Sequence, residues 1–233
     1  MIRKLLLRLF FFLQAFLVFT PGWFLWRLRV RGTKFHRGKG GLIIAANHQS
    51  WIDAPLVQYA VFPHQITFLM TEDYYDLPIA GLYFRASGTQ PVREGGRPSV
   101  AAMRAAYKAL DDGKIICLFP EGEMSPDGKI GEGKRGVAHI ARKTGAPILP
   151  IGIRGAVDVY SKKQPTFKLR GRVSLHVGKP MKMIGTGRAD EEAFMLELMD
   201  RIRELAGEGA HVALPTESAS QPTEEHESRA GSE

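Results

Sequence analysis

Short apolar runs alternate with amphipathic stretches along most of this 233-residue chain. The apolar runs have the length and the Ile, Val and Leu content of buried strands, and they predict strands at residues 42–46, 66–70, 114–119, 147–153 and 173–177. The stretches between them have helical spacing and predict helices at residues 99–110, 137–144 and 191–205. Strands that alternate with helices indicate an α/β fold with a mainly parallel sheet flanked by helices.

The first 30 residues have a different pattern. Residues 5–26 are almost entirely apolar and are long enough to cross a bilayer, but Arg8 and Gln14 interrupt them. The run Thr20-Pro21-Gly22 should also break a helix. We therefore predict that residues 1–30 form an apolar, membrane-associating helical segment, with two short helices lying in one leaflet. A single spanning helix is the alternative.

The rest of the chain divides into two parts. Residues 31–206 contain all of the predicted strands and helices and are long enough to bury a core, so we expect one globular domain. Residues 207–233 are rich in Glu, Ser, Thr and Pro, which predicts a disordered acidic tail. Cys117 is the only cysteine and lies in an apolar run, so it is expected to be a core residue rather than a nucleophile.

Charge is distributed unevenly along the chain. The formal net charge is +8, although six Glu and only one Arg follow residue 206. Nine Lys and Arg residues come before Asp53, the first acidic residue. Such a field attracts either nucleic acid or anionic lipid. Because the basic residues flank a Phe-rich apolar segment and no nucleic-acid motif is present, we predict an anionic membrane surface on the cytoplasmic side as the partner. A basic nucleic-acid-binding module is the alternative.

A polar cluster, Asn47-His48-Gln49-Ser50-Trp51-Ile52-Asp53, directly follows the first of these strands. Sites of α/β proteins lie at this end of the strands. A carboxylate five residues after a histidine can pair with one ring nitrogen across a turn, and the other nitrogen can then accept a proton from a hydroxyl group. Ser50 and Asp53 also match a helix capping box, which needs no chemistry. Both interpretations hold if the cap keeps Asp53 beside His48.

A second polar cluster follows the strand predicted at residues 114–119. Glu121 stands between a proline and a glycine, which force it into a tight turn, either as a functional carboxylate or as a solvated turn residue. Arg93 and the pair Lys134-Arg135 could each hold a phosphate group, or could be solvated surface residues. The chain contains no Gly-x-Ser-x-Gly, which disfavours a serine lipase or esterase.

Taken together and in this order, these motifs resemble the 1-acylglycerol-3-phosphate acyltransferases and related glycerolipid acyltransferases. The family's Asn-His-x-Ser-x-x-Asp block is intact at residues 47–53. Its Phe-Pro-Glu-Gly-Thr-Arg-Ser block resembles Phe119-Pro120-Glu121-Gly122-Glu123-Met124-Ser125. Its Arg-bearing block after a glycine is similar to residues 88–93, and its proline-bounded apolar strand to residues 147–150. The resemblance extends over roughly residues 30–180.

The resemblance implies the transfer of a fatty acyl group from acyl-CoA or acyl carrier protein to the free hydroxyl of 1-acylglycerol-3-phosphate, which gives phosphatidate in phospholipid biosynthesis. It implies that His48 is the general base and that Asp53 orients it. The acceptor and its phosphate would be held by five residues, Arg93, Glu121, Gly122, Lys134 and Arg135. Because the thioester donor is already activated, no metal or other cofactor is expected.

Two positions differ from the family's pattern. Met124 replaces an Arg, and Glu94 follows Arg93 where a second basic residue often occurs. Both changes make the headgroup site less positive. The alternative acceptor is therefore a zwitterionic or amino-acid-derived lysolipid.

Overall fold

A computed structural model describes residues 20, 23–33, 38, 40–71, 89–92, 100–163 and 166–208. Seven strands form one sheet: β1 (Arg29–Gly32), β2 (Leu42–Ala46), β3 (Ile66–Thr71), β4 (Gln90–Val92), β5 (Ile115–Leu118), β6 (Ile148–Arg154) and β7 (Ser174–Val177). The named helices are α2 (Asp53–Ala60), α5 (Val100–Asp111), α6 (Gly136–Thr144), α7 (Ala156–Val159) and α8 (Arg188–Ala206).

The strand order across the sheet is β1-β7-β6-β2-β5-β3-β4. Each neighbouring pair is parallel except β6 and β7, so the predicted α/β fold with a mainly parallel sheet is confirmed. Every strand and helix predicted from the apolar pattern is present within three residues of its expected ends. The short elements β1, β4 and α7 were not predicted, because none of them has an apolar run of its own.

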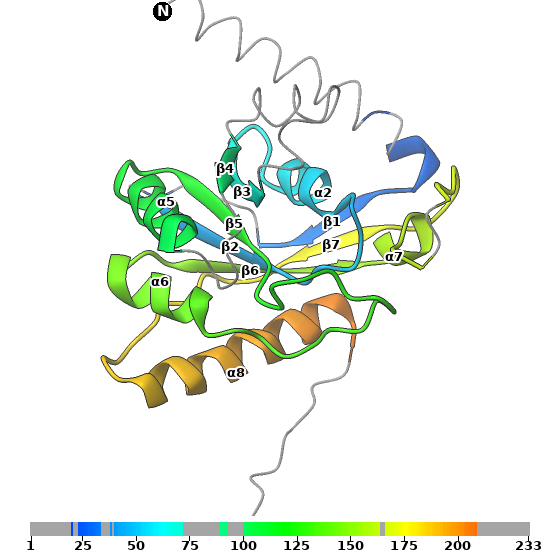
Figure 1. The fold of residues 1–233 in the computed structure, drawn as a ribbon. Helices are drawn as coiled ribbons and strands as arrows, with labels where there is room; N and C mark the ends of the chain where they lie inside the picture. Colours follow the sequence, from blue (N-terminus) through cyan, green and yellow to red (C-terminus); the bar gives the residue numbers. More distant parts are fainter. Residues whose placement is uncertain are drawn as a thin grey trace, which may run out of the picture.

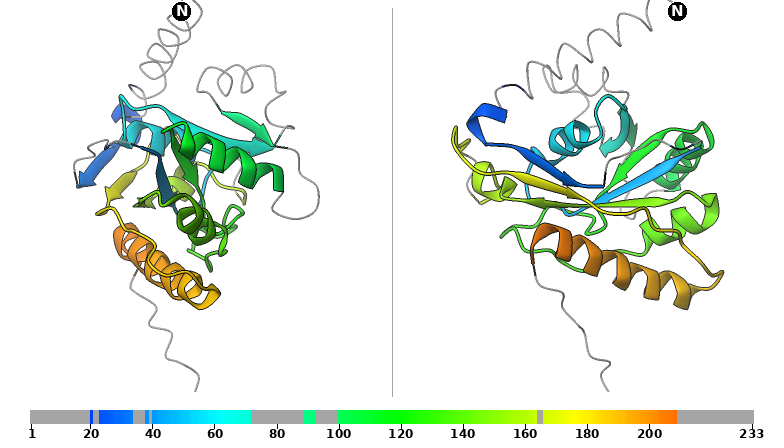
Figure 2. Two further views of the ribbon diagram at one scale, coloured as in Figure 1. Left: turned by 90° about the vertical axis from the view of Figure 1, so that its left-hand side faces the viewer. Right: turned by 180° about the vertical axis from the view of Figure 1, so that it is seen from behind.

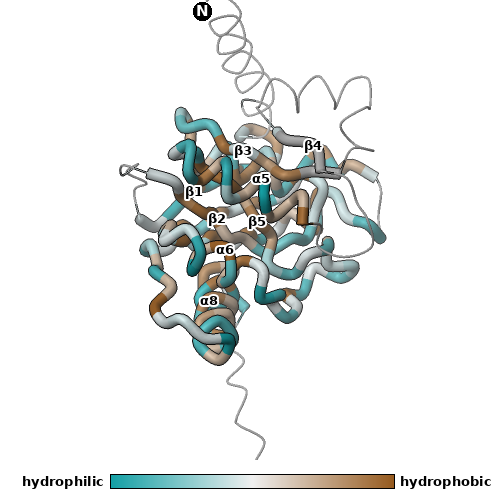
Figure 3. The backbone as a smooth tube through the Cα atoms, turned by 60° about the vertical axis from the view of Figure 1, so that its left-hand side comes forward, coloured by the Kyte–Doolittle hydropathy of each residue, from teal (hydrophilic) through white to brown (hydrophobic). Residues whose placement is uncertain are grey.

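Helices cover both faces of this sheet (Figures 1 and 2). The central strand β2 is fully buried, and its side chains alternate between two cores. Leu42, Ile44 and Ala46 pack on the face covered by α2 and α7, whereas Ile43 and Ala45 pack on the face covered by α5, α6 and α8. A strand buried on both faces reads as a continuous apolar run, as the central strands do in Figure 3.

The lone cysteine belongs to the first of these cores. Cys117 of β5 is buried, and burial raises the pKa of its thiol far above the ordinary value. A thiol with such a raised pKa is not ionised near neutral pH. The structure therefore agrees with the prediction that Cys117 is a core residue.

The predicted membrane segment lies mostly outside the described residues. Within it, Trp23–Leu25 are helical, and β1 crosses residue 30, the boundary suggested by the sequence. Among the helices of the described ranges, none has both the length and the apolar character needed to cross a bilayer. The expected acidic tail lies outside the described residues from position 209 onward.

Candidate active site

Two polar segments meet where β2 and β5 end. Because these strands are parallel neighbours, the residues that follow them lie at the same edge of the sheet. The backbone N–H of His48 donates a hydrogen bond to Oε1 of Glu121, with 2.8 Å between N and O. The backbone N–H of Ser125 donates to the carbonyl oxygen of His48 over 2.8 Å. Two motifs separated by more than 70 residues therefore form one site.

The imidazole of His48 is held by Asp53, the first residue of α2. Oδ2 of Asp53 lies 2.9 Å from Nδ1 of the ring and also accepts hydrogen bonds from the backbone N–H groups of Gln49 and Ser50, each over 2.7 Å. A carboxylate is only an acceptor, so Nδ1 carries the proton of the ring and Nε2 carries the lone pair. The ring stacks on Phe119, with 4.1 Å between the ring centroids, which further limits its rotation.

Asp53 itself is fully buried, with 0% of its surface exposed, whereas 22% of the His48 side chain is exposed. Its second oxygen, Oδ1, has no hydrogen-bond partner among the described residues. Burial raises the pKa of Asp53, and the hydrogen bonds from His48 and from the backbone oppose that rise. The carboxylate of Asp53 thus lies directly against the ring of His48, whose other nitrogen, Nε2, is the one that could accept a proton.

The capping box expected at Ser50 is only half formed. Asp53 does bind the backbone N–H of Ser50, as the acidic residue of such a box would. The hydroxyl of Ser50 donates to the carbonyl oxygen of Tyr160, and its oxygen accepts a longer hydrogen bond from the backbone N–H of Ile52 over 3.4 Å. Ile52, the residue before α2, makes no side-chain cap of its own. Ser50 and Asp53 therefore make part of the expected capping box, and Asp53 stands beside His48 in the first turn of α2.

Asn47 and Gln49 fix the backbone on both sides of His48. The amide of Asn47 makes two hydrogen bonds with the backbone of Ile153 on β6, over 2.7 and 3.0 Å. The amide nitrogen of Gln49 donates to the same carbonyl oxygen over 2.5 Å. Both side chains are buried. The sequence marked these residues as part of a motif, but only the neighbouring strand β6 explains why each is an amide.

Glu121 joins the site to the loop that follows β5. Its Oε2 accepts a hydrogen bond from the backbone N–H of Gly131 over 3.0 Å, while its Oε1 binds His48. Burial raises the pKa of Glu121, and the two backbone donors oppose that rise. Glu121 is thus a buried residue with both oxygens occupied, rather than a solvated turn residue.

The basic residues proposed for phosphate binding separate in the structure. The side chain of Lys134 lies over Gly122, within the loop that Glu121 holds. The guanidinium of Arg135 points to α8, where it lies 3.9 Å from carboxylate oxygens of Glu191 and Glu192. Arg93 lies outside the described residues. Lys134 and Gly122 are therefore brought together with Glu121 and His48, and Arg135 is directed away from them.

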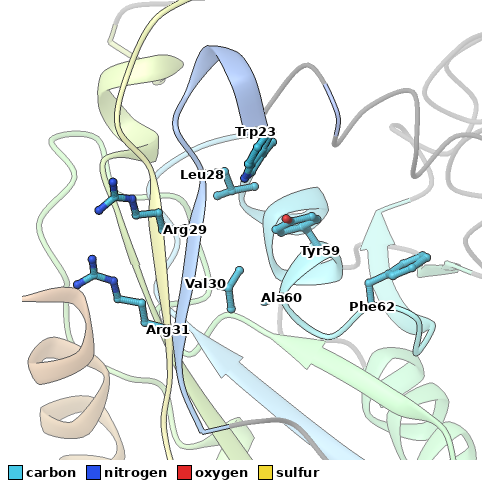
Figure 4. Close-up of a pocket in the computed structure, with 8 residues that line it drawn as sticks. All are labelled: Trp23, Leu28, Arg29, Val30, Arg31, Tyr59, Ala60 and Phe62. Carbon is cyan, nitrogen blue, oxygen red and sulfur yellow. The ribbon is translucent and has the colours of Figure 1, made fainter.

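Cavities open beside β1, the strand at one side of the sheet. One, of about 660 Å³, lies between β1 and α2 (Figure 4). The side chains of Leu28, Val30 and Tyr59 line it together with the exposed rings of Trp23 and Phe62. Arg29 and Arg31 line it as well, so its wall is both polar and apolar, and α2, which begins at Asp53, forms one side of it. Among the described residues, no group of three or more His, Cys, Asp or Glu side chains is arranged to hold a metal ion.

A family model described as "Acyltransferase" matches residues 27–154, which run from β1 through the His48 and Glu121 motifs to the end of β6. The chain belongs to the acyltransferase family. It is therefore an enzyme of the acyltransferase class, as the resemblance of its motifs implied.

Individual relatives of this acyltransferase carry more specific names. The 1-acyl-sn-glycerol-3-phosphate acyltransferase of Bacillus subtilis (strain 168) is 28% identical over 171 residues, which cover 71% of this chain and 81% of the relative. The alpha form from Mus musculus is 29% identical and is covered over 61% of its length. A chloroplastic form from Brassica napus is 26% identical and is covered over only 40% of its length. The chain thus spans less than two thirds of some relatives.

A solved structure has the same fold. The crystal structure of the 1-acyl-sn-glycerophosphate acyltransferase from Thermotoga maritima superposes with a TM-score of 0.67 at 27% sequence identity. The match covers 88% of this chain and 96% of the other. The similarity therefore extends over nearly the whole of both molecules.

Proposed function

We propose that this acyltransferase transfers a fatty acyl group from a thioester donor to the free hydroxyl of 1-acylglycerol-3-phosphate, and so produces phosphatidate. The observation that carries the proposal is the His48–Asp53 pair, with 2.9 Å between Nδ1 and Oδ2 at the carboxyl end of β2. The names of the relatives support the choice of acceptor.

The pair suits general-base catalysis. Nε2 of His48 accepts the proton of the acceptor hydroxyl while its oxygen attacks the thioester carbonyl carbon. The tetrahedral intermediate then expels the thiolate, and the thiolate takes the proton from the imidazolium. The products are an ester and a free thiol. Asp53 holds the ring in the required tautomer and stabilises the imidazolium. Among the described residues, no hydrogen bond joins the ring of His48 to a Ser or Cys side chain, so we write the transfer without a covalent acyl-enzyme intermediate.

We propose that Glu121 is a positioning residue and that Lys134 binds the acceptor phosphate. Glu121 fixes the backbone of His48 and of Gly131 at once, and this shapes the loop that carries Lys134. The ammonium group of Lys134 lies over Gly122, which leaves room for it because it has no side chain. Arg93 remains a second proposed phosphate ligand on the basis of the family resemblance alone. Arg135 is engaged with α8 and is not part of this proposal.

The substrates are amphiphilic, and the N-terminal side of the domain matches them. The cavity between β1 and α2 opens beside the exposed rings of Trp23 and Phe62. Nine basic residues precede Asp53 in the same part of the sequence. Aromatic rings next to basic residues suit the headgroup level of an anionic bilayer. We propose that the enzyme works at a membrane surface and takes its acceptor from the bilayer.

The test is a transfer assay with the full-length protein, labelled acyl donor and a panel of acceptors. We expect the highest kcat/KM with 1-acylglycerol-3-phosphate, lower values with lysophospholipids whose phosphate is a diester, and the lowest with a monoacylglycerol that has no phosphate. A preference for a zwitterionic or uncharged acceptor that Met124→Arg shifts toward 1-acylglycerol-3-phosphate would replace our choice of acceptor by the alternative one. The absence of transfer to any lysolipid would refute the function itself.

A further inference from the structure

A second cavity, of about 610 Å³, also lies beside β1, and Arg29 and Arg31 line both cavities. Five arginines line it, and we call it the arginine groove: Arg27, Arg29, Arg31, Arg154 and Arg172. Asp158 is the only acidic residue among the described residues that line it. None of the five guanidinium groups has an ion-pair partner within the described part of the chain. Among the described residues, the groove thus sets five positive charges against the single carboxylate of Asp158.

Strand register assembles the groove from distant parts of the sequence. Arg29 of β1 pairs with Ser174 of β7, and Ser174 pairs in turn with Arg154 of β6. Side chains on adjacent strands at paired positions share one face of a sheet. Figure 4 shows Arg29 and Arg31 pointing away from the side on which Val30 faces α2. Like charges gathered on one face repel one another, and a bound anion would remove that cost.

Arg27 adds a second, independent sign of a built site. Its φ of +46° lies in the left-handed region, which residues with a Cβ rarely adopt. The flanking backbone holds it there, because the carbonyl oxygen of Trp26 accepts a hydrogen bond from Val173 over 3.0 Å. Strained backbone of this kind concentrates at functional sites. Here the strained residue contributes one of the five guanidinium groups.

The groove lies at the same edge of the sheet as His48. Arg154 ends β6, which runs parallel to β2, and the preceding residue, Ile153, is bound by the side chain of Asn47. The backbone N–H of Val157, in the short helix after Arg154, donates to Oε1 of Gln49 over 3.4 Å. From β2 to β1 the sheet makes three steps of about 4.8 Å, so β1 is roughly 14 Å from β2, the strand that ends shortly before His48. An extended pantetheine arm spans such a distance.

We propose that the arginine groove binds the phosphate groups of coenzyme A while the thioester of the same molecule reaches His48. This inference rests on the proposed acyl transfer and names its donor. The nucleotide end of coenzyme A carries a 3′-phosphate monoester of about −1.5 to −2 charge and a diphosphate, which suits five arginines facing one aspartate. Guanidinium groups bind phosphate through two parallel hydrogen bonds. The volume of the groove is within the range of small-ligand sites, about 300–1,000 Å³. A bilayer, the alternative partner of these arginines, has a flat surface and would not require a cavity.

The test measures the binding of coenzyme A by calorimetry to the full-length protein without any acceptor. The double variant Arg29→Gln/Arg154→Gln should bind coenzyme A about 10- to 150-fold more weakly, the range for losing one charge-assisted hydrogen bond or more. Arg104→Gln is the matched control, since Arg104 is an exposed arginine of α5 near the other end of the sheet, and it should bind as the wild type does. Dephospho-coenzyme A, which lacks the 3′-phosphate, should bind the wild type more weakly and should be less affected by the double variant.

Unchanged affinity for coenzyme A in the double variant overturns the inference, and so does a wild type that binds no coenzyme A or binds dephospho-coenzyme A equally well. Phosphatidylglycerol vesicles distinguish a lipid headgroup as the occupant. If the double variant loses vesicle binding and keeps its affinity for coenzyme A, the groove is a lipid site and the inference is wrong. Failure of the proposed acyl transfer is recognised separately, because coenzyme A binding is measured without catalysis.

Discussion

The side chain of Lys134 crosses directly over Gly122. A Cβ atom placed on Gly122 would come within 2.6 Å of Nζ and 2.8 Å of Cδ of Lys134. Gly122 also has a φ of +75°, and the backbone N–H of Lys134 donates to the carbonyl oxygen of Pro120 over 2.8 Å. Glycine at position 122 therefore permits the left-handed turn and also leaves the space that the side chain of Lys134 occupies.

This relationship predicts a specific defect in Gly122→Ala. The left-handed backbone alone should cost about 1 kcal/mol of stability. The added Cβ should also displace Lys134, so we expect a raised KM for the acceptor. Gly145→Ala is the control, because Gly145 has a φ of +66° but no atom within 4 Å of an added Cβ. Denaturant unfolding and acceptor kinetics should show a similar loss of stability in both variants and a change in KM only in Gly122→Ala. Equal KM values in the two variants would contradict a binding role for Lys134.

The two neighbouring basic residues should behave differently when neutralised. Lys134→Gln removes a charge-assisted contact with the acceptor phosphate, typically worth about 1.5–3 kcal/mol, and should raise the acceptor KM by about 10- to 150-fold with a smaller effect on kcat. Arg135→Gln should leave KM near the wild-type value, because its guanidinium lies 3.9 Å from Glu191 and Glu192 and is 45% exposed. Ion pairs of this kind contribute about 0–1 kcal/mol to stability. If Arg135→Gln raised the acceptor KM more than Lys134→Gln did, Arg135 rather than Lys134 would be the residue that binds the phosphate.

His48→Ala should abolish most of the transfer without unfolding the protein. The loss of a general base lowers the rate by about 10²–10⁴-fold. The backbone N–H of residue 48, which binds Glu121, is retained in the variant, so the loop after β5 should keep its position. Single-turnover transfer and the circular dichroism spectrum measure the two effects. A variant that retained more than about a tenth of the wild-type rate would exclude His48 as the base.

Asp53→Asn should separate catalysis from stability. An amide can accept the three hydrogen bonds now made to Oδ2, but it cannot stabilise an imidazolium, so kcat should fall while the fold persists. Burial raises the pKa of Asp53, which means that the native state holds this proton more tightly than the unfolded chain does. The contribution of the acid to stability is then fully present below its unfolded pKa of about 3.9 and is lost as the pH rises through the folded pKa.

The free energy of unfolding of the wild type, relative to that of Asp53→Asn, should therefore decrease as the pH rises from about 4. Urea unfolding of both proteins at several pH values measures this difference. Asp53→Glu serves as a second comparison, since it keeps the charge and displaces the carboxylate. If the wild type instead gained stability over Asp53→Asn with rising pH, the hydrogen bonds to Oδ2 would outweigh burial and the pKa of Asp53 would be lowered.

The sequence was sufficient for the elements that have a strong local pattern. Buried strands such as β2 and β5 appear as unbroken apolar runs, because a strand covered on both faces has no polar side. β1 was missed because all four of its residues are exposed and two of them are arginines. Its place in the sheet comes from pairing with β7, which lies more than 140 residues away.

By itself, the sequence determined the order of the motifs and the residue types that can carry acyl transfer, because the four residues between His48 and Asp53 allow a turn to join them. Only the tertiary structure decided how these residues are used. It directed the hydroxyl of Ser50 to Tyr160, the amide of Asn47 to β6 and the guanidinium of Arg135 to α8. Such choices depend on which partner lies nearest once the sheet has formed, and partners distant along the chain leave no mark on the local pattern.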